Sequence, residues 1–300
     1  MKSATMGSLL SSTVAATAAL AALALPAMAA TYGQPVDGQL GMQLPASPVA
    51  ESIQVFHDNV TVIITLVTIF VLGLMLYVMV RFNEKANPEP SRFTHNTLVE
   101  VVWTVVPIII LVIIAVPSFK LLNQQYSYPK PDLTIKATGY QWYWSYEYPD
   151  LDGHSFDAVM LTDEERAELK AETGLDYPRN LATDNEVVVP VNKVVHVLVT
   201  AQDVLHNWTV PGFGSKTDAV PGRLTSTWFQ ATREGVFYGQ CSELCGKDHA
   251  FMPITVRVVK QATYDAWTAA VKAKDKSGAK KILQQAAREQ AGIKTVATNQ

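Results

Sequence analysis

The residues best suited to chemistry gather in one short segment, Cys241-Ser-Glu-Leu-Cys245-Gly-Lys-Asp-His249-Ala-Phe-Met252, which holds both cysteines of the 300-residue chain. One more histidine, His206, precedes Cys241 by 35 residues. Two cysteines in an oxidising compartment ordinarily form a disulfide. The neighbouring His and Met side chains favour a metal instead, because thiolates, imidazoles and a thioether together are donors typical of copper.

The second thiolate changes the kind of copper site that the segment predicts. Proteins that bind a single blue copper use two His, one Cys and a weak axial Met. An added thiolate allows two sulfurs to bridge two copper ions, which then share one electron. Each copper would take one imidazole and one weak axial donor, either a Met sulfur or a main-chain carbonyl. The predicted ligands of this binuclear copper centre are His206, Cys241, the Glu243 carbonyl, Cys245, His249 and Met252.

Zinc is the alternative metal, since two Cys and two His are a common zinc set. Zinc would leave Met252 without a role. Zinc modules also usually begin with a close Cys pair that is followed by a distant His pair. A disulfide between Cys241 and Cys245 is the other alternative.

Short β-rich runs surround these residues and must position them. Gly, Pro, Asn and Asp separate the runs, as is typical of a β-sandwich or a Greek-key barrel. We expect this all-β domain to span residues 130–260, with a short acidic helix inserted at 163–172 and a basic helical tail at 261–300. The expected strands are Leu133–Thr138, Tyr140–Tyr148, Glu186–Pro190, Val194–Thr200, Ser226–Ala231, Val236–Gln240 and Ile254–Val259.

Two apolar runs precede the β-rich region. Val60–Val80 and Val101–Phe119 hold no charged residue, and the whole chain is 48% hydrophobic. Each run is long enough to cross a hydrocarbon core about 30 Å thick at about 1.5 Å per residue. The sequence therefore predicts a two-helix transmembrane hairpin with spans at 59–81 and 98–122, joined by a cytoplasmic loop at 82–97.

The N-terminus and the loop charges predict where the domain lies. Residues 1–29 have Lys2, an apolar Ala- and Leu-rich stretch and a final Ala-Met-Ala, which is typical of a signal peptide. The segment 30–58 carries no Lys or Arg, whereas the loop between the spans carries Arg81, Lys85 and Arg92. Because positive loops stay inside, both mature termini and the β domain are expected in the periplasm, on a bacterial inner membrane.

Charge is unevenly distributed along the chain. Residues 131–260 hold 11 Lys and Arg against 18 Asp and Glu, a net of −7, whereas residues 261–300 hold 7 against 3, a net of +4. An acidic exterior face favours a cationic protein partner, since opposite charges steer the two proteins together. No nucleic-acid partner is expected.

The segment Gln240–Met252 closely resembles the CuA loop of cytochrome c oxidase subunit II. Further segments share the resemblance: Arg92–Asn96, Gly139–Tyr148, Leu181–Asn185, Asp218–Arg223 and Trp228. The resemblance covers residues 50–260 and is strongest to alphaproteobacterial members of the aa3 type. It implies a cupredoxin-like domain behind two spans. It also implies an oxidoreductase subunit that takes electrons from cytochrome c at CuA and passes them to haem in subunit I, where oxygen is reduced to water with proton translocation.

The resemblance also implies roles for individual side chains. It makes Trp142 the point where electrons arrive from cytochrome c, and it places Glu100 at the mouth of a proton channel into subunit I. It gives the Glu243 side chain a second role as a ligand of Mg²⁺ shared with subunit I, and a carboxylate suits that hard cation. The carboxylates implied in cytochrome c docking are Glu147, Asp157, Asp184 and Asp203.

Three other kinds of protein share some of these features. A nitrous oxide reductase-like protein carries a similar loop, but it lacks two leading spans and needs a large catalytic domain. A quinol oxidase subunit II shares the fold but has lost the cysteines that stand here at 241 and 245. A fused cytochrome c needs a Cys-x-x-Cys-His motif for its haem, and no cysteine remains for one. The donor cytochrome c and further oxidase subunits would therefore be separate chains.

Overall fold

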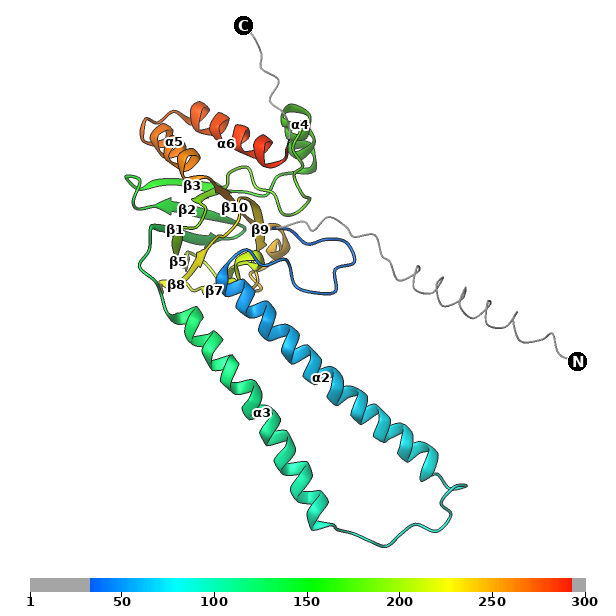
Figure 1. Cartoon of the computed structure of the whole chain (residues 1–300). Coiled ribbons are helices and arrows are strands. Elements are labelled where there is room, and N and C mark those ends of the chain that lie inside the picture. The colour runs from blue at the N-terminus through cyan, green and yellow to red at the C-terminus, as the bar shows by residue number, and fades with distance from the viewer. Residues whose placement is uncertain (1–32, 293–300) are drawn as a thin grey trace, which may run out of the picture. The chain divides into compact units, whose positions relative to one another are not determined.

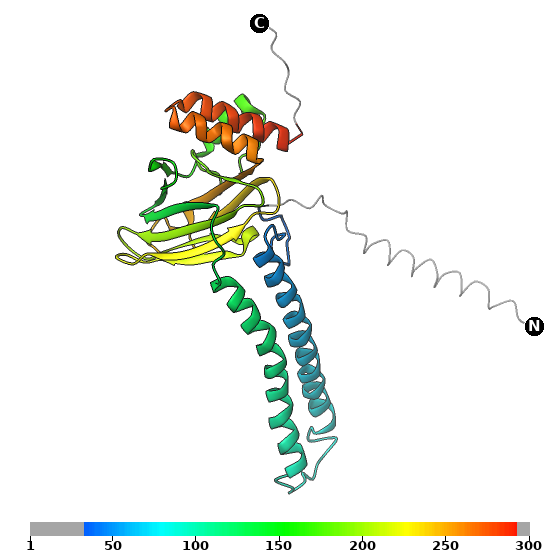
Figure 2. The same cartoon turned by 60° about the vertical axis from the view of Figure 1, so that its left-hand side comes forward.

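The computed structural model describes residues 33–292, and Figure 1 shows its elements in chain order. Two long helices come first, followed by a β-rich domain and a pair of C-terminal helices (Figure 2). The expected signal peptide, residues 1–29, lies outside the described residues, and so does the end of the expected basic tail. The signal peptide therefore stays a prediction.

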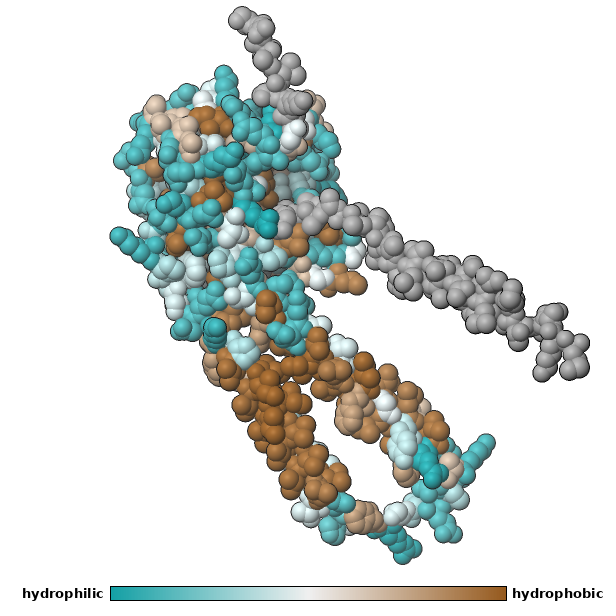
Figure 3. All heavy atoms as spheres, in the orientation of Figure 1, coloured by the Kyte–Doolittle hydropathy of each residue, from teal (hydrophilic) through white to brown (hydrophobic). Residues whose placement is uncertain are grey.

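The two long helices are α2 (Pro48–Arg81) and α3 (Thr97–Tyr126). Side-chain caps begin both: Ser47 accepts a hydrogen bond from the Ala50 amide, and Asn96 accepts one from Val99. Their apolar side chains face outward, as the brown surface of Figure 3 shows. Both helices are long and apolar enough to cross a membrane.

α2 begins 11 residues before the expected span at 59–81, because its first turns belong to the β domain. The Ser47 hydroxyl donates to the Phe213 carbonyl at 2.7 Å, and Val49 and Ala50 are buried. At the end of α3, the Trp228 indole donates to the Gln125 carbonyl at 3.1 Å. Each helix is therefore anchored in the domain at one end.

The β domain contains three sheets. The largest has the strand order β3-β2-β1-β5-β8, in which β1 is antiparallel to β2 and parallel to β5. The second has the order β4-β10-β9, and the third pairs β6 with β7. The strands are β1 (Leu133–Tyr140), β2 (Tyr143–Tyr148), β3 (His154–Ala158), β4 (Val187–Pro190), β5 (Val194–Ala201), β6 (His206–Val210), β7 (Ser215–Ala219), β8 (Thr225–Gln230), β9 (Gly235–Gln240) and β10 (Pro253–Val259).

The core of this sandwich confirms the predicted fold class of two spans followed by an all-β domain. Alternating residues of β1, β2 and β5 are buried, as expected for strands with one face against a core. The packed aromatic residues include Trp144, Tyr146, Phe213, Phe229 and Phe237. The rings of Phe213 and Phe229 stack with centroids 4.4 Å apart.

The structure differs from the predicted strands in two ways. The single run expected at Tyr140–Tyr148 is broken by a turn at Gln141 and Trp142, which creates the β1–β2 hairpin. Strands β3, β6 and β7 were not predicted. Each of these strands is five residues long and holds at most two apolar residues, which is too short a pattern to predict a strand: His-Ser-Phe-Asp-Ala, His-Asn-Trp-Thr-Val and Ser-Lys-Thr-Asp-Ala.

Three shorter helices pack on the domain. α4 (Asp163–Thr173) begins with a capping box between Thr162 and Glu165 and ends at Gly174, which has a positive φ of 72°. α5 (Gln261–Lys272) buries Trp267, whose ring lies 5.5 Å from that of Tyr148. α6 (Lys276–Gln290) joins α4 through Arg288, which donates to the carbonyls of Glu172 and Thr173.

Candidate metal centre

The predicted ligands come from two places in the β domain. His206 opens β6, and the others lie in the connection between β9 and β10, which are antiparallel neighbours. β6 packs against β9, so the two places meet. The contact is close at Gly239, where an added Cβ would overlap the carbonyl oxygen of Thr209. A residue with a side chain at 239 would therefore push the two strands apart.

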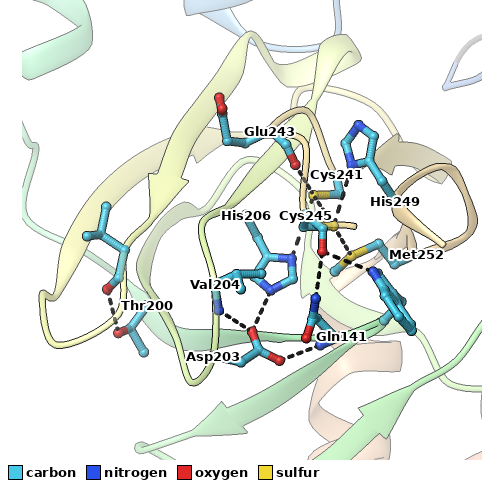
Figure 4. Close-up of polar contacts among 12 residues, drawn as sticks. Gln141, Thr200, Asp203, Val204, His206, Cys241, Glu243, Cys245, His249 and Met252 are labelled. Carbon is cyan, nitrogen blue, oxygen red and sulfur yellow. Dashed lines mark hydrogen bonds and ion pairs between the residues drawn. The ribbon is translucent and has the colours of Figure 1, made fainter. Parts of the chain in front are cut away.

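Two sulfur atoms form the centre of the site (Figure 4). The Sγ atoms of Cys241 and Cys245 lie 3.8 Å apart, and neither cysteine is in a disulfide. The His206 Nδ1 atom lies 3.9 Å from the Cys241 sulfur, and the His249 Nδ1 atom lies 3.5 Å from the Cys245 sulfur. Each sulfur thus has one imidazole nitrogen beside it.

Each sulfur also has one weaker donor beside it. The thioether sulfur of Met252 lies 3.5 Å from the Cys245 sulfur. The main-chain carbonyl oxygen of Glu243 lies 3.3 Å from the Cys241 sulfur. All six predicted ligands therefore come together, and they divide into two similar halves around the pair of sulfurs.

The ligand atoms are shielded from water. His206 is fully buried, Met252 is 1% exposed, and Cys241 and Cys245 are 6% and 3% exposed. The ligand atoms of His206, Cys241 and Cys245 all lie within 4.8 Å of one another. His249 is only partly buried and opens the short helix η2 (His249–Phe251), so it forms the outer side of the site.

A carboxylate fixes the orientation of the buried imidazole. Oδ1 of Asp203 lies 2.8 Å from Nε2 of His206 and also accepts the Val204 amide at 2.6 Å. An ionised carboxylate only accepts hydrogen bonds, so Nε2 carries the proton. The lone pair of Nδ1 then points at the Cys241 sulfur and is free for a metal.

The surroundings separate the pKa values of the two thiols. Burial raises the pKa of Cys241, but hydrogen bonds with His206 and with backbone amides outweigh burial, and the net pKa lies below the ordinary value. Burial, and then the neighbouring Cys241 charge, raise the pKa of Cys245 above the ordinary value. For His206, burial lowers the pKa, but its contacts with Cys241 and Asp203 bring it above the ordinary value.

The donor set fits a soft transition metal. Two thiolates, two imidazoles and a thioether suit copper, and the two similar halves suit two ions that share the sulfurs. The free and adjacent sulfurs also fit a pair of bridging ligands better than a structural disulfide, whose sulfur atoms would lie about 2.05 Å apart.

The β1–β2 turn lies directly against the cysteine loop. The side-chain amide of Gln141 donates to the Cys245 carbonyl at 2.9 Å, and the Trp142 indole donates to the same oxygen at 3.2 Å. Trp142 is partly buried against the core. Gly246, with a φ of 120°, leaves room for this contact, because an added Cβ would lie 3.1 Å from both side chains.

A second glycine makes room for the buried imidazole. An added Cβ at Gly139, the last but one residue of β1, would lie 2.8 Å, 2.9 Å and 3.1 Å from three carbon atoms of His206. The Trp144 ring packs against the same imidazole at a centroid distance of 6.0 Å. The ring of His206 is therefore enclosed by β1 and β2.

The four predicted docking carboxylates lie in different surroundings. Glu147 is half-buried and forms an ion pair with Lys136 at 3.4 Å. Asp157 is exposed, and its carboxylate has no hydrogen bond or ion pair within residues 33–292. Asp184 accepts the amides of Val159 and Asn185, and Asp203 holds His206. Within residues 33–292, the Asp157 carboxylate therefore makes no local hydrogen bond or ion pair, whereas those of Asp184 and Asp203 accept local hydrogen bonds.

Two other predicted residues lie apart from the sulfurs or point away from them. The carboxylate of Glu243 points away from the sulfur atoms in Figure 4, although its carbonyl faces them. Glu100 lies in the first turn of α3, where its side chain accepts the Asn96 amide at 3.3 Å. The opposite end of α3 is the one anchored in the β domain, so Glu100 is at the far end of the hairpin from the sulfurs.

Sequence reasoning missed the supporting residues Gly139 and Gln141 and the local role of Asp203. Asp203 stands three residues before His206 in the same loop, and an acidic residue so near a ligand was a usable signal. Gln141 is separated from Cys245 by 104 residues, and nothing in the sequence pairs them.

Comparisons with known proteins agree with this geometry. Residues 35–121 match the family model of the cytochrome c oxidase subunit II transmembrane domain, and residues 133–259 match that of its periplasmic domain. The chain belongs to the cytochrome c oxidase subunit II family. It is therefore a subunit of an oxidoreductase complex, anchored in the membrane by two spans.

Individual members of the family are similar over most of the chain. Cytochrome c oxidase subunit 2 of Cereibacter sphaeroides is 51% identical over 261 residues, which cover 83% of this chain and 86% of that one. A probable cytochrome c oxidase subunit 2 of Rickettsia bellii is 50% identical over 236 residues, covering 79% and 85%. The crystal structure of the periplasmic domain of oxidase subunit II from Bradyrhizobium japonicum is 55% identical, covers 49% of this chain and 99% of that one, and gives a TM-score of 0.44.

Proposed function

We propose that this chain holds a binuclear copper centre and carries electrons from cytochrome c to haem in subunit I of its oxidase. The observation that supports this best is the division of the donors into two similar halves around two free, buried sulfurs 3.8 Å apart. When bound, the copper pair would take up and release one electron. The rigid surroundings of His206 favour fast transfer, because the ligands need little rearrangement between the two charge states.

The protein's own residues would bring the donor to the right place. Trp142 lies in the β1–β2 turn and its indole donates to the Cys245 carbonyl, which supports its role as the point where electrons arrive. The acidic domain favours a cationic donor such as cytochrome c. Of the four predicted docking carboxylates, Asp157 is exposed and has no hydrogen bond or ion pair within residues 33–292, so we assign it the largest share of docking. We assign the second share to Glu147, which forms an ion pair with Lys136.

Two carboxylates would serve the partner subunit. The outward Glu243 side chain supports a shared Mg²⁺ with subunit I, while the carbonyl of the same residue faces copper. Glu100, at the far end of α3, would receive protons for oxygen reduction and proton translocation in subunit I. These assignments require the β domain and both mature termini in the periplasm of a bacterium and the segment between α2 and α3 in the cytoplasm.

Metal analysis and electron paramagnetic resonance of the full-length chain in detergent test the proposal. The chain should bind two coppers and give a mixed-valence signal in which one electron is shared by both ions. Cys245→Ser should lose this signal, because one remaining thiolate cannot bridge two equivalent coppers. A single copper per chain, or zinc retained after copper loading, would show the proposal to be wrong.

A further inference from the structure

One carbonyl oxygen in the cysteine loop accepts hydrogen bonds from two adjacent side chains. The oxygen belongs to Cys245, and the donors are Gln141 Nε2 at 2.9 Å and Trp142 Nε1 at 3.2 Å (Figure 4). The carbonyl carbon of Cys245 is bonded to its Cα atom, so holding this peptide group in place restrains the Cα–Cβ bond from which the sulfur extends. The family resemblance gives Trp142 a role in electron transfer and gives Gln141 none.

The main chain that presents Gln141 is itself held in place. The Gln141 amide donates to Oδ2 of Asp203 at 2.7 Å, while Oδ1 of the same carboxylate holds His206. The Gly139 carbonyl accepts the Gln202 amide at 3.0 Å. The side-chain amide is therefore directed at Cys245 from a fixed turn, and the positive φ of Gly246 keeps the approach free of a Cβ atom.

We infer that Gln141 is a positioning residue of the metal centre, which acts through the Cys245 carbonyl. The inference rests on the proposed function. Since Trp142 donates to the same oxygen, the two donors back each other up. Loss of either one leaves the carbonyl satisfied by the other, whereas loss of both leaves a shielded acceptor without a protein donor, which costs more than either hydrogen bond alone.

The test compares Gln141→Met, Trp142→Phe and the double variant, because each replacement keeps the size of the side chain and removes the donor. Gln202→Met is the matched control, since Gln202 is an exposed glutamine near the same turn whose side chain makes no hydrogen bond within residues 33–292. The full-length chain in detergent is loaded with copper, and the rate of copper loss to an excess of chelator is measured. The paramagnetic resonance spectrum of each variant is recorded alongside.

Each single variant should lose copper about two- to tenfold faster than the parent chain. The fold-increase in the rate of copper loss in the double variant should be larger than the product of the fold-increases in the two single variants. The spectrum of Gln141→Met should shift, whereas that of Gln202→Met should not. The inference would be overturned if the rate increase in the double variant equalled the product of the two single increases. It would also be overturned if Gln141→Met matched Gln202→Met in both the rate of copper loss and the spectrum.

A measurement on the metal-free chain separates this inference from the proposed function. The alkylation rate of Cys245, followed by mass spectrometry, should rise in the same more-than-multiplicative pattern, because a loosened carbonyl frees the thiol. If the parent chain binds no copper, the proposed function fails, and the alkylation rates still decide whether Gln141 positions the loop. Equal alkylation rates in the parent chain, both single variants and the double variant would overturn the positioning role in that case as well.

Discussion

Asp203 lies 2.8 Å from His206, and its carboxylate also accepts the amides of Val204 and Gln141. The residue predicted to dock cytochrome c is thus also a partner of a metal ligand. Asp203→Ala should weaken copper binding by about 10- to 100-fold, the usual effect of losing such a supporting carboxylate. Asp203→Asn should weaken it less, because the amide oxygen still accepts a hydrogen bond. Copper titrations measure this, and a docking role alone predicts unchanged copper affinity with a raised KM for cytochrome c.

Gly139→Ala should disturb the centre from the opposite side of the imidazole. The new methyl group would meet three carbon atoms of His206 at 2.8–3.1 Å, so the ring must shift or β1 must move. Overpacking of this kind typically costs about 1–3 kcal/mol. We expect a lower Tm and a lower copper affinity, measured by thermal unfolding and by titration. Gly41→Ala is the control, since an added Cβ there meets nothing within 4 Å, and it should change neither quantity.

Loss of the Asp157 carboxylate and loss of the Asp184 carboxylate should have different effects. Asp157→Asn removes a free surface charge, so the KM for cytochrome c should rise at low salt while kcat and Tm stay unchanged. Asp184→Ala should in addition lower the Tm, because the amides of Val159 and Asn185 would lose their acceptor. Steady-state turnover across ionic strengths, together with thermal unfolding, distinguishes them. If turnover changes neither with ionic strength nor on Asp157→Asn replacement, the prediction of an acidic docking face is wrong.

Asp132 should make the domain less stable in acid. A hydrogen bond from the Val194 amide holds the pKa of Asp132 below its ordinary value, although slight burial opposes it and Lys193 assists. Since the pKa is lower in the folded than in the unfolded chain, the stabilisation is present above about pH 4 and is lost as the pH falls through the folded value. Asp132→Asn should therefore lower the Tm at neutral pH, and its Tm should converge with that of the parent chain as the pH falls through the lowered pKa of the folded state. Parallel Tm profiles would contradict this assignment.

Trp142 and Glu100 should affect opposite ends of the reaction. Trp142→Gln should slow reduction of copper by cytochrome c by orders of magnitude while binding of cytochrome c persists. Glu100→Ala should leave copper reduction normal and slow steady-state oxygen consumption, because a proton needed in subunit I arrives late. Stopped-flow reduction and an oxygen electrode measure the two steps. Normal oxygen consumption in Glu100→Ala would make that residue an interfacial charge only.

Local patterns in the sequence predicted the parts of the fold that rest on local physics. The apolar runs gave both long helices, and alternation gave strands such as β5 and β10. It could not give β6, because the strand begins with His206 and Asn207, which are polar residues and yet are buried. The extra length of α2 was also missed, since contacts of Val49 and Ala50 with the domain, rather than local hydropathy, extend the helix.

The candidate site also contains residues that local sequence patterns predict and residues that they do not. Its ligands follow from residue type and short spacing, since Cys241, Cys245, His249 and Met252 lie within one loop. The side chains that hold the ligands in place do not, because hydrogen bonds such as that from Gln141 to Cys245 join residues 104 positions apart. The sequence places Asp203 three residues before His206, but the contact between the two side chains is shown by their distance of 2.8 Å.

The packing of α5 on the β sandwich sets a limit on how the β domain can be produced by itself. Trp267 lies over Tyr148, and the side-chain amide of Gln290 donates to the Val258 carbonyl at 2.8 Å. A recombinant fragment that stops near residue 260 would uncover this aromatic surface and the outer side of β10. Such a fragment would be prone to self-association and would understate the stability of the native domain. Expression boundaries for spectroscopy should therefore extend to residue 292.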